Sequence, residues 1–122
     1  AGFEAAEVEP RLVEWTYGDY EGLTTPQIRE SVPGWTVWTH PSPGGESAAE
    51  IGGRVDEVIS RVRDVDGPVL LVAHGHVLRV LVARWLGMPS REGRSFVLDP
   101  ATVSVLGWER DTPAVRRWNA PT

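Results

Sequence analysis

A continuous apolar run followed at once by a glycine-containing turn is the feature that most constrains the fold. Residues 69–73 read Val-Leu-Leu-Val-Ala, without the alternation of a half-exposed strand. Such a run predicts a buried strand with both faces covered, as in a parallel sheet. After the turn His74-Gly75-His76, apolar residues keep helical spacing over 77–86, and Gly87 then ends the pattern. A strand, a tight turn and a helix in this order predict an α/β layer.

The turn is the place where such a layer would bind an anion. Ligands of doubly wound sheets sit beyond the carboxyl ends of the strands, where helix N-termini direct unpaired amides outward. A glycine at position 75 lets the backbone approach an anion closely. His74 and His76 can donate to a phosphoryl oxygen or carry a proton near neutral pH. Each could instead be structural, His74 satisfied by a carbonyl in the core and His76 half exposed at the helix start.

A second candidate is Glu14, within the segment Leu-Val-Glu-Trp-Thr-Tyr-Gly at residues 12–18. A carboxyl group among aromatic side chains is partly desolvated, which suits it to protonate a leaving group. Any surface loop can also hold a glutamate beside a tryptophan. Read alone, the segment leaves both interpretations open.

The rest of the chain predicts loops, two further helices and a pair of strands. The expected order is a loop over 7–22, a short helix over 27–31 behind an N-cap at Thr24–Thr25, a turn or short helix over 35–39, a loop over 40–45, a helix from Ser47 to about Val65, and strands over 102–108 and 115–118. In the long helix, apolar residues recur on one stripe, and Glu57 and Arg61 lie on a face that we expect to be exposed to solvent. Gly52 and Gly53 each weaken this helix unless close packing requires them.

Composition narrows the functional classes. A length of 122 residues allows one small domain with a core, and a net charge of −5 argues against nucleic acid as a partner. No stretch approaches the ~20 apolar residues of a membrane helix. The sequence has no cysteine, which excludes disulfides and thiolate metal sites, and a cytoplasmic protein is the default expectation. Its six tryptophans could line the interface of a homodimer, although core burial is the commoner use.

Four segments, in order, carry a resemblance to a known family. They are LVEWTYGDYEGLT at 12–24, GGES at 44–47 before a helix that includes Arg54, VLLVAHGHVLRVL at 69–81, and RRWNA at 116–120. In these the chain resembles the histidine phosphatase (phosphoglycerate-mutase-like) superfamily, and in particular actinobacterial acid and broad-specificity phosphatases. The resemblance implies a three-layer α/β fold with a mostly parallel sheet. It also implies that residues 1–122 are the C-terminal portion of a single domain, whose N-terminal strand and helix are absent from this chain.

The activity implied by the resemblance is hydrolysis of a small phosphomonoester through a phosphohistidine intermediate, without a cofactor or a metal. Glu14 matches the acid/base glutamate and His74 the second histidine of the pocket. Gly75 matches the glycine whose amide faces the phosphate. His76 stands where mutases usually have asparagine, and Tyr17 matches a tyrosine near the substrate.

The family's nucleophile lies in an Arg-His-Gly sequence, and no Arg-His pair occurs in this chain. Because Ala1 is not preceded by a methionine, we expect the chain to begin within a longer protein. We further expect these residues to be catalytically inert alone. Aryl phosphate hydrolysis by this chain, lost on His74→Ala, would contradict that expectation.

Three alternatives stay open at this stage. A phosphoglycerate mutase would use the same residues, and a non-catalytic phosphate-binding module could keep the fold without the nucleophile. A metal hydrolase could use His74 and His76 as ligands, but the sequence shows no third ligand at a diagnostic offset.

Overall fold

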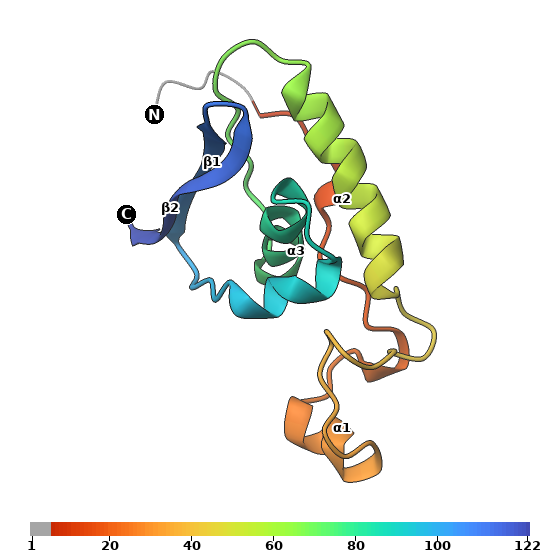
Figure 1. The fold of residues 1–122 in the computed structure, drawn as a ribbon. Coiled ribbons are helices and arrows are strands. Elements are labelled where there is room, and N and C mark those ends of the chain that lie inside the picture. Colours follow the sequence, from red (N-terminus) through yellow and green to blue (C-terminus); the bar gives the residue numbers. More distant parts are fainter. Residues whose placement is uncertain (1–5) are drawn as a thin grey trace.

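The computed structural model describes residues 6–122, and two packed helices form its centre (Figure 1). The elements, in chain order, are 3₁₀ turns at Pro10–Leu12 and Gly18–Tyr20, helices α1 (Thr25–Ser31), α2 (Ala48–Arg63) and α3 (Gly75–Trp85), a 3₁₀ helix at Ser90–Ser95, and strands β1 (Thr102–Glu109) and β2 (Thr112–Pro121). The β-hairpin lies beside α3, and α1 lies away from the hairpin, beyond the start of α2 (Figure 1). Residues 1–5, which include the Ala1 start discussed above, lie outside the described residues. Within 6–122, no helix is long and apolar enough to cross a membrane.

Helix α2 forms where its caps and apolar stripe predict it. The Ser47 hydroxyl accepts a hydrogen bond from the Glu50 amide at 3.0 Å, and the Glu50 carboxylate accepts one from the Ser47 amide at 3.2 Å. This reciprocal pair satisfies two amides at the helix start. The predicted stripe is buried at Ile51, Val55 and Val58, which pack against α3. The helix ends two residues before the predicted limit.

Only one of the two glycines in α2 has a packing reason. A methyl group at Gly52 would collide with the Ser90 hydroxyl unless that side chain moved, so glycine here leaves room for the Ser90 hydroxyl against α2. Gly53 faces open space, and nothing in the structure explains it.

The predicted strand at 69–73 is absent from the structure. No strand forms there, and Val69, Leu70 and Val72 are exposed, so the prediction that both faces are covered is wrong for these residues. Extended backbone cannot satisfy its own amides and carbonyls and needs a neighbour in a ladder. Among residues 6–122 the one sheet consists of β1 and β2, which pair antiparallel. The fold is α/β in content, and the mostly parallel sheet stays a prediction.

Helix α3 begins at Gly75, two residues earlier than its apolar spacing predicts. Val77, Val80 and Val82 are fully buried along it. At its end, the Trp85 indole donates to the carbonyl of Gly107 in β1 at 3.0 Å. The hairpin that contains β1 is therefore fastened to the core through α3.

The segment between the first loop and α2 is built around buried aromatic residues. Helix α1 has a capping box between Thr24 and Gln27, with proline in its first turn as predicted. Residues 37–39 form a turn, and Trp35 and Val37 are buried. A role for tryptophans in a homodimer stays a prediction.

Candidate active site

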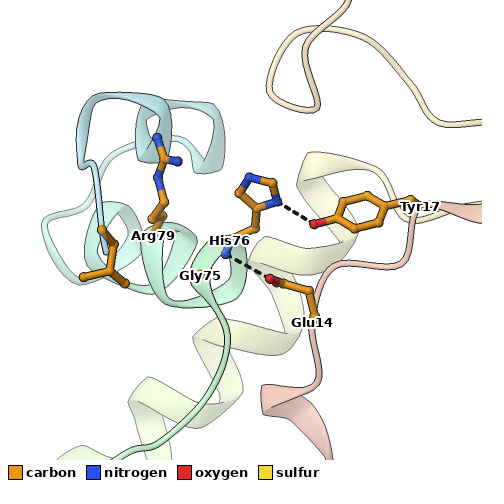
Figure 2. Close-up of a pocket in the computed structure, with 6 residues that line it drawn as sticks. Glu14, Tyr17, Gly75, His76 and Arg79 are labelled. Carbon is orange, nitrogen blue, oxygen red and sulfur yellow. Dashed lines mark hydrogen bonds between the residues drawn. The ribbon is translucent and has the colours of Figure 1, made fainter. Parts of the chain in front are cut away.

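The carboxylate of Glu14 meets the first turn of α3 (Figure 2). Its Oε1 accepts hydrogen bonds from the amides of Val77 at 2.8 Å and Trp15 at 2.9 Å, and its Oε2 accepts one from the His76 amide at 3.1 Å. The first amides of a helix have no partner within the helix, and the helix dipole favours an anion there. Glu14 therefore supplies the cap that the side chain of the N-cap residue, His74, does not.

Tyr17 and His76 form a second contact, with the phenol oxygen 2.5 Å from Nδ1 of the imidazole (Figure 2). Burial raises the pKa of Tyr17, and the carboxylates of Glu14 and Glu21 raise it further, so the phenol keeps its proton. Burial lowers the pKa of His76, and Arg79 adds to this effect while Glu14 opposes it. The phenol therefore donates to a neutral ring. This assigns the ring proton of His76 to Nε2, which faces away from Tyr17.

Arg79 is a further site residue, which no sequence motif singles out. Its guanidinium donates to the carbonyls of Gly93 at 3.1 Å and Arg94 at 3.0 Å, and lies 5.0 Å from the ring centre of Trp38. Burial lowers the pKa of Arg79, yet a guanidinium stays protonated at neutral pH. The available signal was its spacing, because residues three apart on a helix share a face and Arg79 follows His76 by three.

These groups surround a cavity of about 240 Å³. Its lining residues are Glu14, Tyr17, Gly75, His76, Arg79 and Leu98. No acceptor within residues 6–122 is found for the amide of Gly75, which lies at the N-terminus of α3. Leu98 lies in the irregular stretch before β1 and belongs to no motif that could have pointed to it. The cavity thus combines a carboxylate, a neutral imidazole and a cation at a helix N-terminus.

Four of the five predicted site residues come together in this cavity, and one does not. Glu14, Tyr17, Gly75 and His76 all line it. His74 precedes α3 as its N-cap residue, is exposed and does not line the cavity. The described part of the chain offers its imidazole no hydrogen-bond partner. Its role as a pocket histidine stays a prediction.

A larger groove of about 510 Å³ adjoins the cavity and shares Tyr17 and His76 with it. Trp35, Trp38 and Tyr20 line the groove, and the rings of Tyr20 and Trp35 meet edge to face at 5.6 Å. Aromatic walls next to a polar cavity suit a ligand with a charged end and a less polar body.

The hypothesis that His74 and His76 bind a metal ion requires at least one more ligand nearby. Within residues 6–122, no group of three or more histidine, aspartate and glutamate side chains is placed to hold a metal ion.

A helix N-terminus that faces a cavity with acidic, neutral and cationic side chains is typical of sites that process anionic substrates. Comparison with known proteins identifies the family. The chain belongs to the histidine phosphatase superfamily (branch 1), whose family model matches residues 2–121.

Individual relatives agree with this assignment. An acid phosphatase of Mycobacterium tuberculosis is 45% identical over 111 residues, which cover 89% of this chain and 55% of that protein. Sedoheptulose 1,7-bisphosphatase of Saccharomyces cerevisiae is 32% identical over 98 residues, which cover 66% of this chain and 36% of that protein. The chain therefore spans about half or less of the length of these two relatives.

Solved structures share the fold. The product of an open reading frame of Mycobacterium tuberculosis superposes with a TM-score of 0.93 at 40% identity, over 98% of this chain and 63% of that one. The α-ribazole phosphatase of Shigella flexneri gives a TM-score of 0.75 at 25% identity, over 94% of this chain and 62% of that one.

Proposed function

We propose that this chain forms part of a phosphomonoester hydrolase that works through a phosphohistidine intermediate. The observation that carries the proposal is the position of Glu14, whose carboxylate lies at the N-terminus of α3 in the same cavity as His76 and Arg79. The relatives named above are called phosphatases or a bisphosphatase, which favours hydrolysis over mutase chemistry. The histidine at position 76, where mutases usually have asparagine, favours the same choice.

In the proposed site, the phosphoryl group lies at the start of α3. The Gly75 amide and the Nε2 proton of His76 donate to its oxygens, and Arg79 supplies positive charge. His74, at the exposed edge of the same turn, donates to the transferring group once substrate is bound. The groove lined by Trp35 and Trp38 takes the body of the leaving alcohol.

Glu14 serves as acid and then as base. In the first step a histidine nitrogen bonds to phosphorus, the bond to the leaving oxygen breaks, and that oxygen takes the proton of Glu14. In the second step Glu14 takes a proton from water as the water oxygen attacks phosphorus and the histidine leaves. Oε2 of Glu14 makes one hydrogen bond whereas Oε1 makes two, so Oε2 is the oxygen assigned to carry the proton.

The nucleophilic histidine is assigned to an upstream Arg-His-Gly segment, since the 122 residues contain no such sequence. The 122-residue chain alone is therefore expected to bind phosphate without turning over phosphomonoesters. The enzyme that carries the upstream segment, here termed the completed enzyme, is expected to turn them over.

Glu14→Gln in the completed enzyme tests the proton-donor role. We expect kcat/KM for an alkyl phosphate to fall about 10²- to 10⁴-fold, the usual contribution of a general acid, because an alkoxide leaves poorly without a proton. An activated aryl phosphate, whose phenolate leaves unaided, should lose far less. The measurement is kcat/KM for a matched alkyl and aryl series.

Glu50→Gln is the matched control, because the Glu50 carboxylate also accepts a backbone amide at a helix start but lies outside the cavity. It should leave both substrate classes unchanged. Equal losses for alkyl and aryl substrates in Glu14→Gln would remove Glu14 from the proton-donor role. A completed enzyme that binds phosphate but hydrolyses neither class would instead favour a non-catalytic module.

A further inference from the structure

The guanidinium of Arg54, in the second turn of α2, holds the backbone that leads into Glu14. Its Nη1 donates to the carbonyls of Arg11 at 2.6 Å and Val13 at 2.7 Å, and its Nη2 donates to the carbonyl of Glu14 itself at 3.1 Å. Three carbonyls within four consecutive residues thus converge on one side chain. The Arg54 side chain is only 16% exposed, and its bonds to the carbonyls of Arg11 and Glu14 are partly buried.

The same guanidinium forms a two-pronged ion pair with Glu46, with Nε 2.8 Å from Oε2 and Nη2 2.9 Å from Oε1. The Arg54 guanidinium is the main cause that holds the pKa of Glu46 below its usual range. A fork of this kind fixes both the position and the plane of the guanidinium, which a lysine ammonium cannot do.

Glu46 in turn holds the residues that follow Glu14. Its carboxylate accepts the amide of Thr16 at 2.9 Å, and its own amide donates to the Thr16 carbonyl at 2.8 Å. Its carbonyl accepts the indole N–H of Trp15 at 3.0 Å. The Arg54–Glu46 pair therefore fixes the chain on both sides of Glu14, in a stretch that has no regular secondary structure.

We infer that Arg54 and Glu46 are positioning residues, which hold the Glu14 carboxylate at the N-terminus of α3. The inference rests on the proposed function for its catalytic consequence, although the placement of Glu14 can be tested without catalysis. Neither residue lines the cavity, so neither contacts the substrate. Their effect passes through the backbone of residues 11–16, where a shift of about 1 Å at a reacting group can cost about 10²-fold in rate.

A second forked ion pair in the chain, more exposed than the first, provides a control. Arg84 of α3 forms a two-pronged pair with Asp56 of α2, at 2.9 and 3.0 Å, and donates to the carbonyl of Met88 at 3.1 Å. This pair joins α3 to α2 and has no contact with the Glu14 loop. Arg54→Met and Arg84→Met therefore both remove a forked ion pair, and only the first releases Glu14.

The first experiment needs no activity and uses the 122-residue chain. Amide hydrogen exchange is measured by NMR at His76 and Val77, whose N–H groups are held by Glu14. We expect exchange at these two amides to accelerate about tenfold or more in Arg54→Met and by less in Arg54→Lys, which keeps the charge but loses the fork. Arg84→Met should leave their exchange unchanged relative to the core amide of Leu81. Unchanged exchange at His76 and Val77 in Arg54→Met would overturn the inference.

The second experiment uses the completed enzyme and the alkyl and aryl phosphate series. Arg54→Met should lower kcat/KM for alkyl phosphates about 10- to 100-fold while sparing aryl phosphates, and should add little to Glu14→Gln in the double variant. Equal losses on both substrates in Arg54→Met, with a selective loss in Glu14→Gln, would overturn the inference and leave the proposed function standing. A non-selective Glu14→Gln would overturn the proposed function, and the exchange data would then decide the positioning role alone.

Discussion

Two apolar runs flank the His74-Gly75-His76 turn, and one is buried while the other is largely exposed. After the turn, α3 buries Val77 and Val80 completely. Before it, Val72 is 83% exposed and Leu70 is 58% exposed. Both runs are rich in the same aliphatic residues, so hydrophobicity alone does not separate them.

The difference lies in where each run finds its hydrogen bonds. A helix pairs its own amides and carbonyls and can pack as soon as one face is covered, here by α2. An extended run needs a partner strand, and residues 6–122 supply none for it. The helix side of the turn is therefore stabilised by this chain itself, and the strand side is not.

Leu81→Ala, on the buried run, should have the largest effect on the free energy of unfolding. Leu81 is buried in the core between the helices, so its truncation leaves a cavity and should lower the free energy of unfolding by about 2–5 kcal/mol. Urea unfolding of the 122-residue chain, followed by tryptophan fluorescence, measures the change. A loss near zero would mean that α3 is not packed as described.

An intermediate effect is expected from pH, because His76 lies on the buried side of the turn. Its pKa is lowered in the folded state by burial and by Arg79, against the opposing effect of Glu14, with the Tyr17 hydroxyl bound to Nδ1. The unfolded chain then binds a proton more readily, so stability should fall as the pH drops through and below about 6.5, the unfolded value.

Urea midpoints compared at about pH 7.5 and about pH 5.5 test this, because the carboxylates titrate mainly below that window. His76→Gln should flatten the dependence. His74→Asn, on the exposed side of the turn, should leave it as in the unsubstituted chain. The opposite pattern would place the buried imidazole at position 74.

The smallest effect is expected from Leu70→Ala, the same substitution made on the other run. An exposed side chain contributes little, so the free energy of unfolding of the 122-residue chain should change by less than about 0.5 kcal/mol. The same urea experiment measures it beside Leu81→Ala. A loss comparable to that of Leu81→Ala would show that the run is covered in solution.

Sequence patterns predicted well those elements whose determinants are local. The caps at Thr24 and Ser47 and the stripe of α2 lie within a few residues of what they specify, and the structure confirms them. The start of α3 was missed by two residues because the carboxylate that holds its first amides, that of Glu14, lies more than 60 positions away. The strand at 69–73 was wrong for the same reason, since a strand depends on a distant neighbour.

The residues of the candidate site also differ in how well the sequence predicts them. The resemblance gathered Glu14, Tyr17, His74, Gly75 and His76, and the structure brings all of them except His74 together at the cavity. The spacing of Arg79 from His76 indicates only a shared helix face, and its contacts with Gly93 and Trp38 come from the tertiary arrangement.

The hydrogen bond from Val77 to Glu14 closes a chain segment that spans 63 positions. The entropy lost in closing a loop of that size exceeds what one or two hydrogen bonds return, so the packing of α2 on α3 must supply the difference. No partly folded form that keeps α3 but releases α2 can hold the carboxylate in place. Formation of the site therefore depends on contacts distant in sequence as well as on the turn that first marked it.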